Sequence, residues 1–262
     1  MRVIIAKNED AMSKIAAGII AENIRKKPRL VLGLDVSNTL IGAYNELAAM
    51  HKTGKLDFSR VISFNLDEYV GLGHDHPQSC KSFMDKNFFN KVNFDNRNIF
   101  IPNGLTKNLH LMCEQYEKNI KEMAGIDLQV LGIGKDGHIG FNESGSSLSS
   151  RTRIKTLSED TVKERSKYFK KKDENPKFAI TVGVGTIMES RMCMLLACGK
   201  RKTDILVKAI EGPVTTSVPA SMLQLHSNVL VVCDEEAGAK LKQKNYYRYV
   251  EKMNKLIEVA QI

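Results

Sequence analysis

The residues best suited to chemistry lie in the stretch Leu128 to Ser144, which reads LQVLGIGKDGHIGFNES. Asp136 and His138 are two positions apart, so in an extended turn their side chains converge on one side, and Glu143 returns close enough to hydrogen-bond the same imidazole. A histidine flanked by carboxylates is held in one tautomer and exchanges a proton near neutral pH. The backbone can turn tightly and approach a ligand at four glycines, Gly132, Gly134, Gly137 and Gly140. The stretch predicts either a reaction site or an elaborate turn.

Two other interpretations of this stretch fail on its context. Gly132, Gly134 and Gly137 have the spacing of a dinucleotide-binding turn, but HIGFNESGSS follows where that motif needs a continuing helix. A single histidine in the stretch completes no set of metal ligands. We therefore expect neither a metal nor an organic cofactor here.

A second acidic cluster follows the run VISFN, where Asp67 and Glu68 emerge directly from an expected buried strand. Desolvation there raises a carboxylate pKa toward the range of a general base. The alternative is a helix or turn cap whose acids are solvated. His74 and His76 resemble a metal pair, but their loop is rich in Gly and Asp, which favours surface histidines.

Anion-binding groups follow two other strands. The stretch LDVSNTL leads into an expected helix, so Ser37, Asn38 and Thr39 offer backbone N–H groups to an anion, or serve as an ordinary N-cap. Lys202 lies near a helix start after Gly199 and is suited to holding phosphate or to forming part of the charged surface. The same two interpretations apply to Arg151, Arg153 and Lys155, which alternate along an extended segment.

The elements that position these residues alternate along the chain. Expected strands are Val3–Ala6, Leu30–Leu34, Val61–Asn65, Leu128–Leu131, Phe178–Thr181, Cys193–Ala197 and Val229–Cys233. Expected helices are Ala11–Arg25, Thr39–Met50, Ser82–Phe89, Leu109–Met123, Thr203–Ile210 and Glu235–Lys255. Strands that are apolar throughout indicate burial on both faces, which predicts an α/β, Rossmann-like fold with a mostly parallel sheet and helices on both faces. Ligands bind beyond the carboxyl ends of such strands.

Composition narrows the function further. The 262 residues show no linker or repeat, so we expect one domain over 1–262, and no apolar run approaches the roughly 20 residues of a membrane span. Five scattered cysteines with no CxxC pair fit a reducing cytoplasm. The net charge of +9 is spread along the chain without a nucleic-acid signature, so it favours an anionic small molecule over nucleic acid.

Several long motifs, in the same order, resemble the glucosamine-6-phosphate deaminases, also called glucosamine-6-phosphate isomerases. These are FNLDEYVGLGHDHPQSCKSFM, GIGKDGHIGFNES, SSLSSRTRIKTL, PKFAITVGVGTIM and PASMLQLH, which together run through nearly the whole chain. The resemblance implies a Rossmann-like fold and conversion of an amino-sugar 6-phosphate to the ketose phosphate plus ammonia, without a metal or cofactor.

The resemblance also implies residue roles. His138 would open the sugar ring, oriented by Asp136 and Glu143, and Asp67 would move a proton between C2 and C1. The family's allosteric members bind N-acetylglucosamine 6-phosphate between the subunits of a hexamer. The matching positions are Ser146, Arg153, Lys155 and Thr156, so we expect a homo-oligomer, with an allosteric hexamer as one hypothesis and a monomer or dimer as the alternative.

The sequence departs from the family at the substrate phosphate. The family's loop resembles Leu-Pro-Thr-Gly-Gly-Thr-Pro, whereas this chain has Asp35, Val36, Ser37 and Asn38 in place of Pro, Thr and both glycines. Lys167 stands where the family has a phosphate-binding arginine, while Lys202 matches a family phosphate ligand. These changes open two alternatives to a glucosamine-6-phosphate deaminase. The chain could act on galactosamine 6-phosphate, or it could be a non-catalytic sensor that binds amino-sugar phosphates. A 6-phosphogluconolactonase is the rival on the same fold, and it would not need Asp67 as a base.

Overall fold

The computed structural model describes residues 1–169 and 175–260 and has a seven-stranded parallel sheet at its centre. In spatial order its strands are β1 (Arg2–Ala6), β10 (Val229–Asp234), β9 (Cys193–Ala197), β6 (Leu128–Gly132), β2 (Val31–Leu34), β3 (Ile62–Asn65) and β5 (Ile99–Phe100). Most of these residues are buried, as expected where helices cover both faces of a parallel sheet. The predicted fold class is confirmed.

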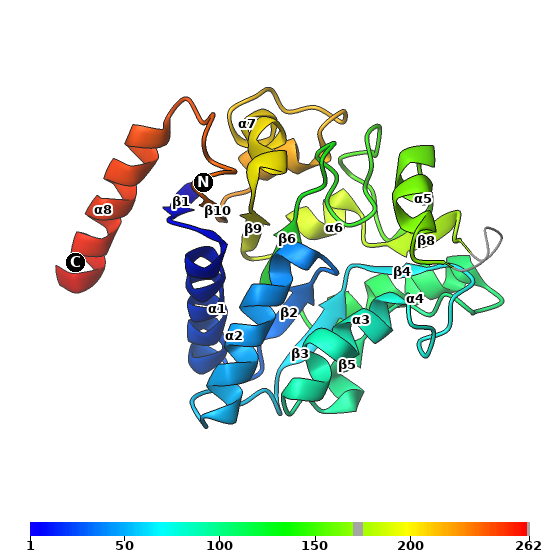
Figure 1. Cartoon of the computed structure of the whole chain (residues 1–262). Coiled ribbons are helices and arrows are strands. Elements are labelled where there is room, and N and C mark those ends of the chain that lie inside the picture. Colours follow the sequence, from blue (N-terminus) through cyan, green and yellow to red (C-terminus); the bar gives the residue numbers. More distant parts are fainter. Residues whose placement is uncertain (170–174, 261–262) are drawn as a thin grey trace.

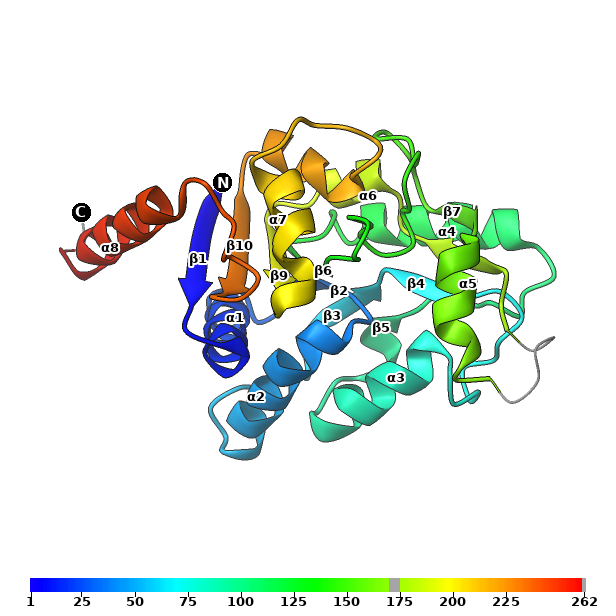
Figure 2. The ribbon, with the colours of Figure 1, turned by 45° about the horizontal axis from the view of Figure 1, so that its top comes forward.

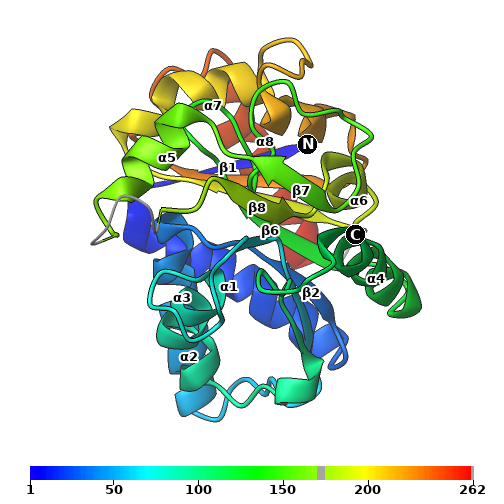
Figure 3. The ribbon, with the colours of Figure 1, turned by 90° about the vertical axis from the view of Figure 1, so that its right-hand side faces the viewer.

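Each face of the sheet packs against its own set of helices and has its own apolar core (Figures 1 and 3). One face carries α1 (Glu9–Lys26), α2 (Ile41–Lys52) and α3 (Cys80–Asn87), and the other carries α4 (Leu109–Glu122), α6 (Val184–Met188) and α7 (Thr203–Ile210). Short 3-10 turns connect these elements: η1 (Asn38–Leu40), η2 (Phe89–Lys91), η3 (Asn96–Asn98), η5 (Lys200–Lys202) and η6 (Pro219–Leu225).

A second, antiparallel sheet corrects one part of the sequence prediction. Phe178–Thr181 is a strand, β8, but it pairs with β4 (Asp67–Tyr69) and β7 (Arg153–Thr156) instead of joining the parallel sheet. Helix α5 (Glu159–Ser166) lies beside this small sheet (Figures 2 and 3). Because β4 follows β3 after one residue, the second sheet extends from the carboxyl edge of the first.

The C-terminal helix α8 (Lys244–Ala260) begins nine residues later than the expected start at Glu235. The carboxylate of Asp234 accepts the N–H of Ala237 at 2.7 Å, and this contact stabilises a turn where a helix was expected. Helix α8 lies beyond the edge strand β1 (Figure 1), with Glu251 paired to Arg2 at 2.7 Å. Within the described ranges, no helix combines the length and apolar character needed to cross a bilayer.

The chain order places a topological switch point between β2 and β6. These strands are neighbours in the sheet, although the chain forms β3 and β5 between them and then returns. Loops that leave two such strands diverge to opposite sides, which opens the crevice where α/β sheets bind ligands. The fold therefore predicts a site at the carboxyl ends of β2 and β6.

Candidate active site

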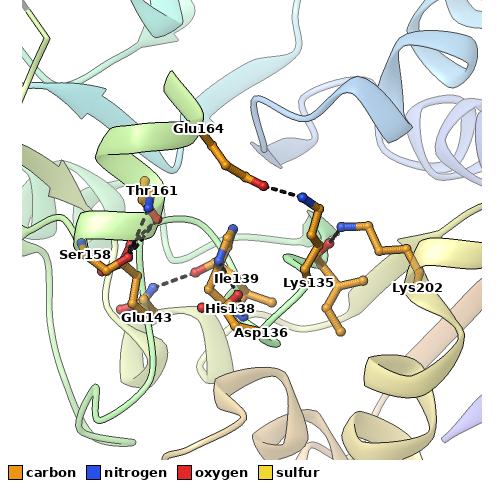
Figure 4. A network of polar contacts seen from close by, with 11 residues as sticks. Lys135, Asp136, His138, Ile139, Glu143, Ser158, Thr161, Glu164 and Lys202 are labelled. Carbon is orange, nitrogen blue, oxygen red and sulfur yellow. Dashed lines mark hydrogen bonds and ion pairs between the residues drawn. The ribbon is translucent and has the colours of Figure 1, made fainter. Parts of the chain in front are cut away.

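His138 and Asp136 form a fixed pair in the loop after β6. Nδ1 of His138 lies 2.6 Å from Oδ1 of Asp136 (Figure 4), so the spacing predicted their convergence correctly. Burial raises the pKa of Asp136, but the hydrogen bond and charge of His138 outweigh it and bring that pKa to about 2. An ionised Asp136 engages Nδ1, which leaves Nε2 as the atom that exchanges protons with a ligand.

Asp67 begins β4 with its carboxylate almost fully covered, at 3% exposure. Oδ1 accepts the N–H of Phe141 at 3.2 Å, so the acid contacts the loop that carries His138. Burial, and after it the negative charge of Asp35, raise the pKa of Asp67 to about 7. This carboxylate has the properties of a base that works near neutral pH, and the solvated-cap alternative is wrong for it.

Glu68 points the other way and serves as a cap. Its carboxylate accepts the N–H groups of Cys80 and Lys81, at 2.9 and 3.1 Å, at the start of α3. An anion at a helix N-terminus satisfies amides that have no partner within the helix. Adjacent acids therefore have different tasks, because side chains alternate along a strand.

Glu143 does not contact the imidazole, which corrects the expectation from its spacing. Its Oε2 accepts the N–H of Ser158 at 2.8 Å, and its Oε1 accepts the hydroxyls of Ser158 and Thr161 at 3.0 and 2.5 Å. Figure 4 shows this carboxylate directed at the first turn of α5, away from His138. Glu143 thus joins the loop after β6 to α5.

Two lysines lie side by side on the opposite side of His138 (Figure 4). Lys202 is half-buried, and its Nζ donates to the carbonyl of Ile133 at 2.5 Å. Burial lowers the pKa of Lys202, and the charge of Lys135 lowers it further. Lys135 pairs with Glu164 of α5, so this helix is tied to the loop at two points.

Arg165 of α5 lies toward the carboxyl edge of the sheet, and the sequence prediction missed it. Its Cζ lies 5.8 Å from the ring centre of Tyr69, and its charge lowers the pKa of the buried Asp35 against the larger effect of burial. The predicted ligand Lys167 is exposed, with Nζ 4.9 Å from the ring centre of Tyr168. Residues two apart on a helix lie on nearly opposite sides, so Arg165 lies beside Tyr69 while Lys167 is exposed.

The loop after β2 is organised around Asp35. Its Oδ2 accepts the N–H of Gly132 at 2.7 Å, and its carbonyl accepts the hydroxyl of Tyr44 at 2.7 Å. Val36 packs against the core under α1 and α2 and against a smaller cluster that includes Tyr69 and Phe141. Gly132 permits this approach, since a Cβ there would lie 2.7 Å from Oγ of Ser37. The carboxylate of Asp35 therefore joins the loop after β2 to strand β6.

The other predicted phosphate groups of this loop lie at its helical end. Ser37 precedes η1 without a capping hydrogen bond from its side chain, Asn38 is exposed, and Thr39 accepts a weak contact from Sγ of Cys198 at 3.9 Å. Within the described residues the only non-glycine with positive φ is Ala124, so Asn38 does not adopt the left-handed conformation that a glycine would favour. Their role in anion binding stays a prediction.

The predicted effector residues lie on and before β7. Nη1 of Arg153 donates to Oδ1 of Asn142 at 2.9 Å, and Asn142 donates to the carbonyl of Ile139 at 3.0 Å. Ser146 is buried at 2% exposure, and Lys155 and Thr156 continue the strand. Of these four residues, Arg153 is the one whose side-chain hydrogen bond reaches the loop after β6.

The two loop histidines contact backbone groups, and the ring of His76 also stacks on Phe169 with 5.9 Å between the ring centres. Nε2 of His74 lies 3.2 Å from the carbonyl of Pro102, and Nδ1 of His76 accepts the N–H of Gln78 at 3.1 Å. No cluster of three or more metal-ligating side chains occurs in the part of the chain that the structure describes.

The chain resembles known proteins over most of its length. A profile of the family described as glucosamine-6-phosphate isomerases/6-phosphogluconolactonase matches residues 7–232. A glucosamine-6-phosphate deaminase from Clostridium perfringens (strain 13 / Type A) is 46% identical over 242 residues, which are 92% of this chain and 100% of the relative. One from Thermoanaerobacter sp. (strain X514) is also 46% identical, over 94% of this chain and 97% of its own length.

Solved structures add the fold. A glucosamine-6-phosphate deaminase described as monomeric superposes with a TM-score of 0.88 at 41% identity, over 92% of this chain and 100% of its own. The 6-phosphogluconolactonase from Trypanosoma cruzi superposes with a TM-score of 0.73 at 20% identity, over 92% of this chain and 97% of its own. The second likeness is one of fold alone.

Proposed function

Because the chain belongs to the family of glucosamine-6-phosphate isomerases and 6-phosphogluconolactonases, we propose that it is an amino-sugar-phosphate deaminase. It converts glucosamine 6-phosphate and water to fructose 6-phosphate and ammonia. The observation that carries this proposal is a buried carboxylate, Asp67, together with the His138–Asp136 pair at the carboxyl edge of the parallel sheet, in a chain 46% identical to such deaminases. A lactonase needs no base beside a carbon acid, so Asp67 favours the deaminase.

The reaction assigns each group a proton. His138, with Nδ1 held by Asp136, uses Nε2 to move a proton between the ring oxygen and the C1 hydroxyl, which opens the sugar. Asp67 takes the proton from C2 and returns it to C1 through an enolamine. Water then adds at C2 and the amine leaves as ammonia. The phosphate faces Lys202 and Arg165, whose charges lie at the same edge of the sheet.

The direct test is ammonia release from the purified protein with glucosamine 6-phosphate and galactosamine 6-phosphate side by side. His138→Gln is the matched blank, because it keeps the size of the side chain and removes the proton relay. We expect the wild type to release ammonia from glucosamine 6-phosphate, and we expect His138→Gln to release none. Release only from the galacto epimer would assign the alternative substrate, to which the altered loop at Asp35–Asn38 points. Tight binding of either sugar phosphate without ammonia release would show that the protein is a sensor and not an enzyme.

We also propose the domain organisation and the cellular compartment of the enzyme. It acts as a single isomerase/deaminase domain on a small sugar phosphate, in the cytoplasm, as its free cysteines favour.

A further inference from the structure

Three side chains on one face of the small antiparallel sheet contact the loop after β6. Asp67 of β4 and Arg153 of β7 are each paired with Thr181 of the central strand β8. Residues directly opposite one another in antiparallel strands have their side chains on the same face. Thr181 is fully buried there, and the proposed reaction leaves it without a task.

The hydroxyl of Thr181 and the carboxylate of Asp67 lie side by side against Phe141. The N–H of Phe141 donates to Oγ1 of Thr181 at 3.1 Å and to Oδ1 of Asp67 at 3.2 Å, so the two side chains share one amide proton. A Cβ built on Gly140 would lie 3.0 Å from Oδ1 of Asp67 and 3.2 Å from Oγ1 of Thr181. Two separate reference points therefore place the hydroxyl beside the carboxylate.

The hydroxyl proton of Thr181 has two acceptors within reach. Because Oγ1 accepts from Phe141, its own proton points elsewhere, toward the carboxylate of Asp67 or toward the carbonyl of Val182 at 3.5 Å. An ionised carboxylate attracts such a proton more strongly than a carbonyl at the limit of hydrogen-bond distance. Burial dominates the raised pKa of Asp67, and the hydrogen bond from Thr181 opposes it, which agrees with donation to the carboxylate.

We propose that Thr181 is a positioning residue for the base, because its hydroxyl holds the ionised carboxylate of Asp67 at the loop that carries His138. A carboxylate free to rotate would lose its alignment with C2 of the substrate, so the hydroxyl acts on proton transfer more than on substrate binding. The inference rests on the proposed function where it names Asp67 as the base. The contact between Thr181 and Asp67 belongs to the folded protein.

Several charged or titratable groups face Asp67 from the surrounding elements. They are Asp35 after β2, His138 after β6, Tyr69 of β4, Cys80 of α3 and Tyr116 of α4, with Arg153 of β7 beyond Thr181. All of them stay in place when position 181 alone is substituted. A difference between variants at this position therefore reports the hydroxyl.

The kinetic test compares Thr181→Val, which keeps the shape and removes the hydroxyl, with Thr181→Ser, which keeps the hydroxyl. Ammonia release is measured against pH and substrate concentration. We expect Thr181→Val to lower kcat about ten-fold and to leave KM nearly unchanged, because the hydroxyl acts when the proton leaves C2. The acid limb of kcat/KM should move up by about one pH unit, since Asp67 loses a hydrogen bond that favours its ionised form. Thr181→Ser should restore both properties.

Thr186→Val is the matched control, because it removes another buried hydroxyl, one that donates to Glu117 of α4 at 2.7 Å. It should keep the kcat and the acid limb of the wild type. Wild-type kcat and an unmoved acid limb in Thr181→Val would overturn the proposal. A Thr181→Ser variant as impaired as Thr181→Val would overturn it too, because the hydroxyl would then not be the group that matters.

A measurement without substrate separates this inference from the proposed function. NMR titration of isotope-labelled aspartate carboxyl groups gives the pKa of Asp67, with Asp67→Asn to identify its signal. We expect a higher pKa in Thr181→Val than in the wild type, and the wild-type pKa in Thr181→Ser. That result without ammonia release from the wild type would keep the contact and reject the deaminase. Ammonia release with an unmoved pKa of Asp67 would keep the deaminase and reject the contact.

Discussion

The imidazole of His138 occupies space that only a glycine at position 134 leaves open. A Cβ built on Gly134 would lie 2.2 Å from Cε1 of His138 and 2.3 Å from Nδ1. The N–H of Gly134 also donates to the carbonyl of His138 at 2.9 Å, which closes the turn that presents the ring. The second glycine of the Gly-x-Gly spacing thus reflects packing against the His138 imidazole.

Gly134→Ala should therefore damage activity more than folding. The ring must move from Asp136 to avoid the new methyl group, and a displacement of about 1 Å in a catalytic group costs roughly 10²-fold in kcat/KM. The matched control is Gly18→Ala inside α1, where a Cβ meets nothing within 4 Å. That control should keep the activity and gain about 1 kcal/mol in urea unfolding. Full activity in Gly134→Ala would contradict this account of the ring.

Arg165 and Lys167 allow a comparison between two cations of one helix end. Arg165 lies beside Tyr69, whereas Lys167 is exposed. A charge-assisted hydrogen bond contributes about 1.5–3 kcal/mol, so Arg165→Ala should raise KM for glucosamine 6-phosphate roughly ten-fold or more. Lys167→Ala should change it less than about two-fold. A larger effect at Lys167 would restore the role that the family resemblance assigned to it.

At the scale of elements, Glu143 fixes α5 over the site. Three donors from Ser158 and Thr161 converge on its carboxylate, and a glutamine would turn an NH₂ group toward some of them. Glu143→Gln should raise KM several-fold and speed hydrogen exchange in the α5 amides, because the helix loses part of its anchor. Glu159→Gln is the control, since it removes an exposed acid from the first turn of the same helix.

The opposite pattern would assign Glu143 a different role. If kcat falls while exchange in α5 stays as in the wild type, Glu143 acts on the imidazole during the reaction, as the family resemblance implied. The separation of helix dynamics from kcat decides between the two roles.

The elements that sequence patterns predicted are those with strong apolar periodicity. Helix α7 has the predicted bounds, and six of the predicted strands lie in the parallel sheet, because burial on both faces leaves a continuous apolar run. Helix α5, with the sequence EDTVKERS, and strand β4, with DEY, carry no such run. Pairing with β8 and contacts to Glu143 and Lys135 hold them in place, so only tertiary contacts define them.

The candidate site was predictable to the same degree. Asp136 and His138 are close in the sequence, so local geometry alone brought them together correctly. Arg165 was missed because its segment shows no periodicity that distinguishes the inward side from the outward one. The contact of Asp35 with the N–H of Gly132 required the order of strands in the sheet, which relates residues 97 positions apart and leaves no mark in local sequence.

At the scale of the whole molecule, the predicted effector residues connect to catalysis through a short path. Arg153 donates to Asn142, and Asn142 donates to the carbonyl of Ile139, the residue after His138. An anion that competes for the Arg153 guanidinium would therefore change contacts of the catalytic loop. A related deaminase described as monomeric aligns with 92% of this chain, so the assembly of this protein stays a prediction.

Sedimentation velocity and initial-rate kinetics, each with and without N-acetylglucosamine 6-phosphate, test the prediction of an allosteric oligomer. We expect an oligomer whose rate depends sigmoidally on substrate concentration when the effector is absent. Saturating effector should raise the rate at low substrate and make the dependence hyperbolic, because the effector favours one arrangement of the loop in every subunit. Arg153→Lys keeps the positive charge but loses the two-pronged guanidinium that could bind Asn142 and the effector phosphate at the same time. This variant should therefore lose most of the activation by the effector. Lys118→Arg on the exposed face of α4 is the control and should retain it. A monomer with hyperbolic kinetics that ignore the effector would show that Arg153 only supports the loop.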